Sequence, residues 1–163
     1  MWPFKKQTPT RRTSPVIGKT IGHFVIEPFQ GVGPIRFGMH KDEVSHTFTC
    51  VFKSFFKGPK SKIRSDDIEA YGLIIHYGTD SRVDYIEIFK PVFATVTLEL
   101  FGRDITGISV RDTFALLSSH SATFTKAAYG YDFPTLGVST YNSHLESEDQ
   151  PVECFGLKAS GSR

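Results

Sequence analysis

The second half of this chain repeats the first half in the same order. Residues 38–44, with sequence GMHKDEV, reappear 69 residues later as GISVRDT at 107–113, with Gly, apolar and acidic residues in register. Farther along, GLIIHY at 72–77 is similar to GVSTY at 137–141. Self-similarity of two segments in the same order indicates that one supersecondary unit occurs twice. The repeat therefore constrains the architecture more than the chemistry, because neither copy carries a catalytic cluster that the other lacks.

Each copy predicts a strand, a helix and a pair of strands. The leading strands are expected near 23–26 and at 95–101, and the paired strands at 73–77 with 83–88 and at 136–141 with 152–155. Hairpins need antiparallel partners, and amphipathic helices must bury their apolar stripes. We therefore expect an α+β chain in which tandem duplicated strand-helix-hairpin units form a mostly antiparallel sheet, with two short helices packed on one face.

Capping patterns predict where the two helices begin. His40 with Glu43, and Ser109 with Asp112, occupy the N-cap and N3 positions of a capping box. The second box is expected to be the better one, because a hydroxyl accepts a backbone hydrogen bond more readily than an imidazole does. The apolar residues expected to be buried at helical spacing are Val44, Phe48 and Val51 or Phe52 in the first helix, and Phe114, Leu117 and Leu116 in the second.

The repeat is expected to form one domain between two flexible ends. Residues 1–20 combine three prolines with five cations and lack hydrophobic periodicity, which predicts a flexible basic tail. Residues 21–157 are then a single α+β domain made of two pseudo-repeats, 21–90 and 91–157. Residues 158–163 are expected to be a flexible C-terminus.

The composition argues against several classes of protein. Only Cys50 and Cys154 occur, far apart, which is typical of reduced thiols in the cytoplasm. No apolar run reaches the length of a signal peptide or a membrane span. His46 and Cys50 are four residues apart, but no second pair completes a metal site. We therefore expect a cytoplasmic protein that is not an enzyme and that has no metal, no cofactor and no membrane span.

Catalytic alternatives would need residues brought together by the fold. Asp66, Asp67 and Glu69 have the chemistry of paired carboxylates, but after a run of cations they are more typical of a solvated helix start or loop. A hydrolase would need a pocket that gathers His, Asp and Ser from distant positions, which the sequence alone does not reveal.

The charges behind the net charge of +2 are unevenly distributed along the chain. Residues 1–64 hold 12 Lys and Arg against 3 Asp and Glu, whereas residues 65–163 hold 7 against 14. The acidic segment 142–151 is also the main length difference between the copies. Loops on a rigid scaffold often carry recognition, and an electronegative surface steers a cationic partner. The residues expected to contact such a partner are Asp132, Glu146, Glu148 and Asp149.

The stretch 31–44, with sequence GVGPIRFGMHKDEV, resembles the opening of a group of small bacterial proteins. The likeness continues through the strand pair at 72–77 and 83–87 and covers about residues 30–155. Some of these proteins resemble immunity proteins encoded beside polymorphic or contact-dependent toxins. The resemblance implies a cytoplasmic immunity-type binding protein that neutralises a cognate toxin by forming a stoichiometric complex. A basic nuclease domain would suit the acidic residues named above.

The alternative hypothesis is a nucleic-acid or anionic-surface binding protein. Residues 52–64 interleave cations with aromatic rings, as single-stranded nucleic-acid sites do, and residues 1–19 add further cations. The candidate contacts are Lys53, Phe55, Lys57, Lys60, Lys62 and Arg64. The competing interpretation of residues 52–64 is structural. The phenylalanines would complete the buried face of the first helix, and the cations would lie on an exposed loop.

Overall fold

A computed structural model describes residues 22–89, 96–144 and 146–161. The helices are α1 (Lys41–Thr47) and α2 (Val110–His120), and η1 (Glu69–Tyr71) is a 3-10 turn. The strands are β1 (Gly22–Glu27), β2 (Gly31–Val32), β3 (Ile35–Arg36), β4 (Lys53–Phe55), β5 (Ser65–Ile68), β6 (Leu73–Tyr77), β7 (Val83–Phe89), β8 (Val96–Leu100), β9 (Arg103–Asp104), β10 (Thr125–Ala127), β11 (Gly130–Phe133), β12 (Val138–Tyr141) and β13 (Cys154–Lys158). The predicted basic tail and the predicted repeat boundary at residue 90 lie outside the described residues. The α+β class is confirmed.

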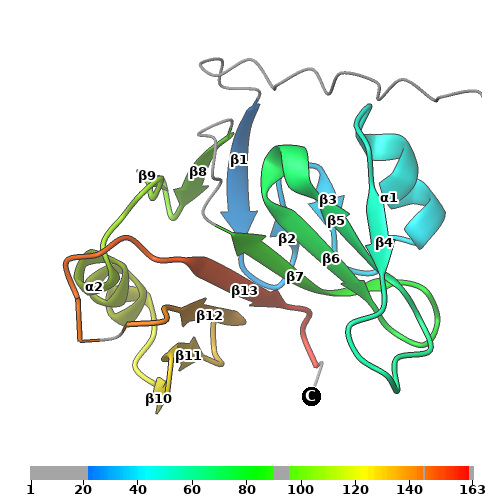
Figure 1. Ribbon diagram of the computed structural model, residues 1–163. Helices are drawn as coiled ribbons and strands as arrows, with labels where there is room; N and C mark the ends of the chain where they lie inside the picture. The colour runs from blue at the N-terminus through cyan, green and yellow to red at the C-terminus, as the bar shows by residue number, and fades with distance from the viewer. Residues whose placement is uncertain (1–21, 90–95, 145, 162–163) are drawn as a thin grey trace, which may run out of the picture.

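An eight-stranded antiparallel sheet runs through both halves of the chain in the order β10-β11-β12-β13-β7-β6-β5-β4 (Figure 1). Its central contact joins β7 of the first half to β13 of the second, where Ile88 lies opposite Phe155 and Ile86 lies opposite Leu157. Each half contributes four consecutive strands to this sheet. The two halves therefore share one continuous hydrogen-bonded layer.

A second sheet corrects the expectation that all strands belong to one sheet. It has the order β3-β2-β1-β8-β9, and its central strands β1 and β8 pair in parallel, with Phe24 opposite Leu98 and Ile26 opposite Leu100. The alternation of side chains in residues 95–101 predicts a strand but does not specify its partner. The leading strands of the two halves, β1 and β8, pair with each other in the small sheet. The larger sheet is therefore formed without them.

Both helices pack against one hydrophobic core. Val44 of α1 and Leu117 of α2 are fully buried, in the same cluster as Leu73 and Ile86 of the large sheet. Figure 1 shows α1 and α2 at opposite ends of the molecule, with β1 and β8 between them. The helices and the small sheet therefore contribute to the same core as the eight-stranded sheet.

The two capping boxes differ in completeness, although the serine hydroxyl makes the shorter cap bond, as expected. In α1 the His40 backbone N–H donates to Glu43 Oε2 at 2.6 Å, and His40 Nδ1 accepts from the Asp42 N–H at 3.3 Å. In α2 the Ser109 hydroxyl accepts from the Asp112 N–H at 3.1 Å but donates to the Asp112 carboxylate at 3.0 Å. Aspartate is one methylene shorter than glutamate, and here its carboxylate meets the hydroxyl rather than the backbone. The reciprocal capping box thus belongs to the first helix.

The first helix is shorter than the apolar spacing predicts. It ends at Thr47, and Phe48 is buried as an extended C-cap residue rather than on a helical face. Of the two alternatives Val51 and Phe52, Val51 is 78% exposed, whereas Phe52 is partly buried and packs against the core. In α2, Leu117 is buried as expected, whereas Phe114 and Leu116 are only partly buried. The apolar residues from Phe48 onward do not form a helical face, because the chain becomes extended at Phe48.

Each helix start is tied to the connection between two later strands by the same backbone hydrogen bonds. The donors and acceptors in the second half lie 69 residues after those in the first. The bonds are Val83 N to Met39 O (2.9 Å) and Lys41 N to Ser81 O (2.9 Å), and then Val152 N to Ile108 O (3.0 Å) and Val110 N to Gln150 O (2.9 Å). The motif that the sequence repeats is therefore the point where helix and hairpin meet.

Four strands of the large sheet, β4, β5, β10 and β11, lie where the sequence predicts only connections. β4 and β10 are exposed at every position, so they show no apolar alternation. β5 contains Asp66, which is 2% exposed and accepts a hydrogen bond from Tyr77 Oη at 2.7 Å, while Lys41 Nζ lies 3.1 Å from it. The interpretation of Asp66 as a solvated residue is wrong, because side chains from other elements satisfy its charge.

The domain also extends beyond residue 157. Lys158 is the last residue of β13 and lies opposite Tyr85, and the Ala159 N–H donates to Asp84 O at 3.1 Å. These two residues of the predicted C-terminal segment therefore belong to the sheet.

Candidate binding surfaces

The acidic loop, residues 142–151, connects β12 to β13 and is fastened to the start of α2. The Arg111 N–H donates to Glu148 O at 2.9 Å. The Arg111 guanidinium lies 3.6 Å from the Glu148 carboxylate and 3.0 Å from that of Asp149. Glu146 is 82% exposed at its side chain and lies 3.8 Å from His144. The loop is thus held by its backbone and by one cation, and it keeps Glu146 at the surface.

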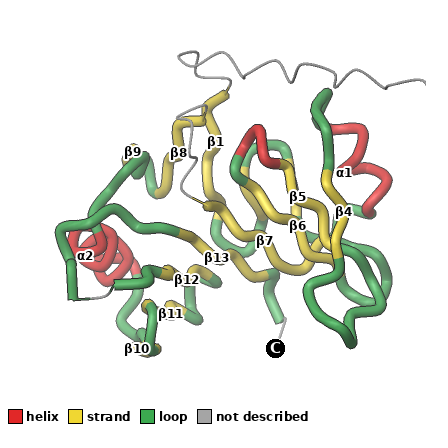
Figure 2. The backbone as a smooth tube through the Cα atoms, viewed as in Figure 1, coloured by secondary structure: helices red, strands yellow, loops and turns green. Residues whose placement is uncertain are grey.

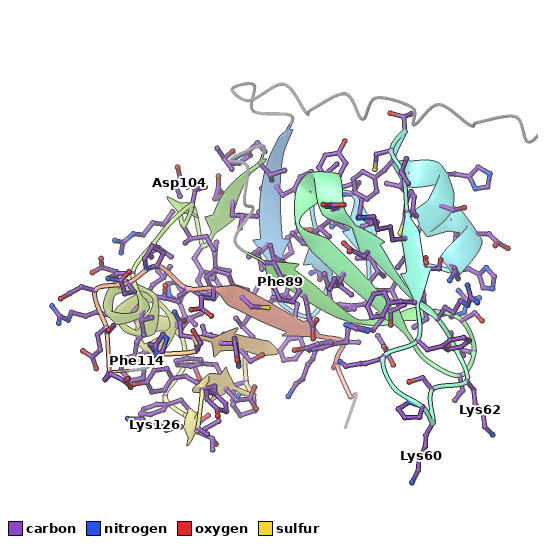
Figure 3. All side chains as sticks on the ribbon, viewed as in Figure 1. Lys60, Lys62, Phe89, Asp104, Phe114 and Lys126 are labelled. Carbon is purple, nitrogen blue, oxygen red and sulfur yellow. The ribbon has the colours of Figure 1, made fainter. Side chains whose placement is uncertain are left out.

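A groove of about 770 Å³ separates the acidic loop from the tip of the β10–β11 hairpin. Its lining comprises Arg111, residues 126–128 and residues 146–150. Figure 3 shows Lys126 on the hairpin side. Three of the four predicted acidic contacts, Glu146, Glu148 and Asp149, therefore share one wall of a groove.

Asp132 does not belong to that groove. It lies in β11 opposite Ser139, with Oδ2 3.5 Å from Lys158 Nζ. Its Oδ1 is buried without a hydrogen-bond partner among the described residues. The fold therefore separates the fourth acidic residue from the other three.

The face of the eight-stranded sheet opposite the core, called here the open face, is covered by neither helix. Side chains alternate across a sheet, so the residues adjacent to the buried Ile86, Ile88, Phe155 and Leu157 point to this face. At its centre a Cβ on Gly156 would overlap the Tyr85 hydroxyl and the Ser139 hydroxyl. Both side chains therefore fill the space that the glycine leaves.

Three exposed aromatic residues lie along one end of the open face and form the aromatic row. Phe89 lies opposite Cys154, and Cys154 lies opposite Tyr141, so the side chains of Phe89, Cys154 and Tyr141 share this face. The Tyr129 ring lies 5.7 Å from the Tyr141 ring. Phe89, Tyr141 and Tyr129 are 40%, 46% and 56% exposed. Phe89 follows Tyr85 and Glu87 at intervals of two residues, so alternation along the strand already predicts that the three side chains point to one face.

A polar cluster beside the aromatic row joins three strands. Ser65 Oγ lies 2.7 Å from His76 Nδ1, His76 Nε2 lies 3.3 Å from Glu87 Oε2, and Lys57 Nζ lies 3.5 Å from Glu87 Oε1. Interaction with the His76 imidazole, assisted by Lys57, holds the pKa of Glu87 below its ordinary value despite partial burial. Sequence reasoning missed this cluster because its members come from β5, β6, β7 and a loop.

The cluster has the residue types of a hydrolase but not the access that a hydrolase needs. Ser65 is 4% exposed and His76 is 7% exposed, so a substrate cannot reach the serine hydroxyl. Burial also raises the pKa of Cys154 to about 12, which suppresses its thiolate. The polar groups of the open face are therefore suited to holding structure and to hydrogen bonding rather than to nucleophilic attack.

The basic loop, residues 56–64, joins β4 to β5. Lys53 pairs with Glu69, Lys57 pairs with Glu87 and lies 5.3 Å from the centre of the Tyr85 ring, and Arg64 lies 4.9 Å from the centre of the Phe56 ring. Figure 3 shows Lys60 and Lys62 at the loop tip, where neither forms an ion pair with a described residue. Figure 2 shows this loop and the acidic loop at opposite ends of the molecule.

Of the three phenylalanines of residues 52–64, Phe52 packs against the core, but Phe55 and Phe56 do not. Phe55 is 36% exposed on the edge strand β4, and Phe56 is 51% exposed. The structural account of these two residues is therefore wrong. The chain leaves α1 before it reaches them, so their rings stay at the surface.

His46 and Cys50 are the candidate metal ligands of the first half. His46 Nδ1 lies 2.6 Å from the Asp42 carbonyl oxygen, and Cys50 lies beyond the end of α1. Among residues 22–89, 96–144 and 146–161, no group of three or more His, Cys, Asp or Glu side chains is arranged to hold a metal ion. Neither described helix has the length and apolar character needed to cross a membrane.

Comparison with protein-family models, with curated proteins and with solved structures finds no match to this chain. The functional argument therefore rests on the open face, the two loops and the groove.

Proposed function

We propose that this chain is a cytoplasmic immunity-type binding protein that neutralises a cognate protein toxin by forming a stoichiometric complex. The observation that carries the proposal is the aromatic row on the open face, where Phe89, Tyr141 and Tyr129 are 40% to 56% exposed. Aromatic side chains dominate the energetics of protein interfaces, because each buries a large apolar area at low entropic cost. Three such rings clustered at one end of a sheet face are suited to anchoring a protein partner.

The surroundings of the row supply polar contacts. Glu87 and Lys57 lie beside it as an ion pair, and Asp132 lies farther along the same face. The acidic loop adds Glu146, Glu148 and Asp149 at the end of the molecule away from the basic loop. An aromatic anchor with charges at its periphery would favour a partner of positive charge, such as a basic nuclease domain.

We also propose that the scaffold consists of tandem duplicated strand-helix-hairpin units. The support is the pair of backbone hydrogen bonds at each helix start, which recur after 69 residues, together with the four strands that each half gives to the large sheet. Duplication explains why these bonds are kept while the loops differ. A scaffold of this kind presents recognition loops without needing an active site.

The test is co-expression with the toxin-like reading frame expected beside the gene. We expect the wild-type chain to rescue growth and to form a 1:1 complex with the toxin. Replacing Phe89 and Tyr141 together by Asp should weaken the complex at least about 100-fold, since two interface anchors contribute about 2 kcal/mol or more each. Val51→Asp, at a position that is 78% exposed and far from the row in sequence, is the matched control. Absence of both rescue and complex with the wild-type chain would reject the proposal.

A second candidate function is binding of single-stranded nucleic acid by the basic loop. It is favoured by Arg64 lying on the exposed ring of Phe56, beside Lys60 and Lys62 at the tip. Replacing these three cations by Gln should abolish binding of a labelled oligothymidine and flatten its salt dependence. Binding that is absent at 50 mM salt, or unchanged in the variant, would reject this candidate.

A further inference from the structure

β10 forms one end of the eight-stranded sheet. It pairs with β11, and no other described strand lies on its far side. Every residue from 122 to 129 is exposed, including Phe124 at 46%. An edge strand of this kind presents backbone groups that an extended chain can pair with.

The register shows which backbone groups of β10 point outward. Tyr131 of β11 lies opposite Lys126, and the Tyr131 N–H donates to Thr140 Oγ1 on the β12 side. Backbone groups alternate in direction along an antiparallel pair, so Tyr131 does not bond to β10 and Lys126 directs its N–H and C=O to the free edge. The Lys126 ammonium lies 5.9 Å from the centre of the Tyr131 ring, over the sheet, and so it does not block that edge.

The groove beside β10 determines which kind of chain fits. Its hairpin wall is formed by residues 126–128, and its opposite wall carries Glu146, Glu148 and Asp149. The backbone bond from Arg111 to Glu148 O fixes this wall in the free protein, so little ordering is needed on binding. A strand added to β10 would place alternate side chains toward the groove, where cations would meet Glu146 and share Glu148 and Asp149 with Arg111.

We infer that the free edge of β10 captures an extended, Lys- or Arg-rich segment of a partner protein by strand addition, with the acidic loop selecting its charge. The inference rests on the proposed function only in taking the partner to be a protein. It names a contact separate from the aromatic row. The backbone of β10 supplies the affinity, and the acidic loop supplies the specificity.

The test uses a fluorescein-labelled octapeptide of sequence TKVKTKVK and the full chain, measured by fluorescence anisotropy at 50 mM salt. We expect Lys126→Pro, which removes the outward N–H, to weaken binding at least about tenfold, while Lys126→Ala leaves it within about twofold. Replacing Glu146 and Glu148 by Gln and Asp149 by Asn should weaken binding about tenfold at 50 mM salt and less at 500 mM. A peptide N-methylated at alternate amides should lose binding, which tests backbone pairing without altering the protein.

Three outcomes would overturn the inference: no binding of TKVKTKVK, unchanged binding by Lys126→Pro, or equal binding of the matched peptide TEVETEVE. Sedimentation that shows a wild-type dimer and a Lys126→Pro monomer would also overturn it, because a second copy would then occupy the edge. The peptide assay needs no toxin, so its failure leaves the proposed function standing. Conversely, the chain could fail to rescue growth while still binding the peptide in a way that Lys126→Pro weakens. That pair of results would reject the toxin proposal alone.

Discussion

The two halves of the molecule hold their helices in the same way but differ in the connection that makes this contact. In the first half, the Lys41 N–H is held by Ser81 O in the short connection between β6 and β7. In the second half, the Val110 N–H is held by Gln150 O in the acidic loop, which spans residues 142–151. The comparison teaches that two connections of different length can make the same backbone hydrogen bond to a helix start.

A second difference lies at the centre of the open face. Glu87 of β7 lies directly opposite Gly156 of β13, and these residues are also 69 positions apart. The first half places a charged side chain there and pairs it with His76 and Lys57. The second half leaves a space that the Tyr85 hydroxyl fills. The halves therefore contribute complementary shapes to one surface.

The largest effect is expected from breaking the core that the halves share. Leu117→Ala in α2 should lower the free energy of unfolding by about 2–5 kcal/mol, because the side chain is fully buried. Since β7 pairs with β13, we expect one urea transition and faster amide exchange in β6 as well as in β12. Ser119→Ala, at an exposed position of the same helix, is the control and should change stability by less than about 0.5 kcal/mol. Two separate transitions would show that the halves fold independently.

An intermediate effect is expected from the helix caps. Ser109→Ala should lower the free energy of unfolding by about 1 kcal/mol, because the Asp112 N–H loses its acceptor. His40→Ala should cost about 0.5 kcal/mol, since its 3.3 Å bond is longer and the Glu43 carboxylate still holds the backbone N–H of residue 40. Ser109→Thr keeps the hydroxyl and should recover most of the loss. Urea midpoints that rank His40→Ala as the more costly change would contradict this comparison.

The smallest effect is expected from Glu87, which is partly exposed. Its pKa is lowered in the folded state, so the stability that it contributes is complete above its ordinary value of 4.5. That contribution is lost as the pH falls through the lowered pKa, because the unfolded chain then binds the proton more readily. Glu87→Gln should therefore reduce stability near pH 7 and bring the two proteins closer together below pH 4.5.

The difference between wild type and Glu87→Gln, measured by thermal unfolding from pH 3 to 7, isolates this carboxylate from Asp67 and Asp84, whose pKa values burial raises. A difference that does not change with pH would show that the contact with His76 contributes nothing. The corresponding residue of the second half, Gly156, has no titratable side chain, so the pH effect tests the first half alone.

Local patterns predicted the parts of the fold that depend on neighbouring residues. The N-caps at His40 and Ser109 and the strands predicted at 73–77 and 83–88, observed at 73–77 and 83–89, follow from capping chemistry and alternation. The strands β4 and β10 were missed because every one of their side chains is exposed. Of the acidic residues, Glu146, Glu148 and Asp149 came together because they share one loop, whereas Asp132 lies on a strand with another face and another partner.

The sequence by itself determined the α+β class, the hairpin strands β6 and β7 and the points where the helices begin, because each depends on residues within a few positions of one another. Only the tertiary structure decided that β1 pairs with β8 in parallel and that β7 pairs with β13. It also assembled the aromatic row and the groove beside β10. Pairing between distant strands depends on competition among all available edges and faces, and a periodic pattern shows which face is buried without showing what covers it.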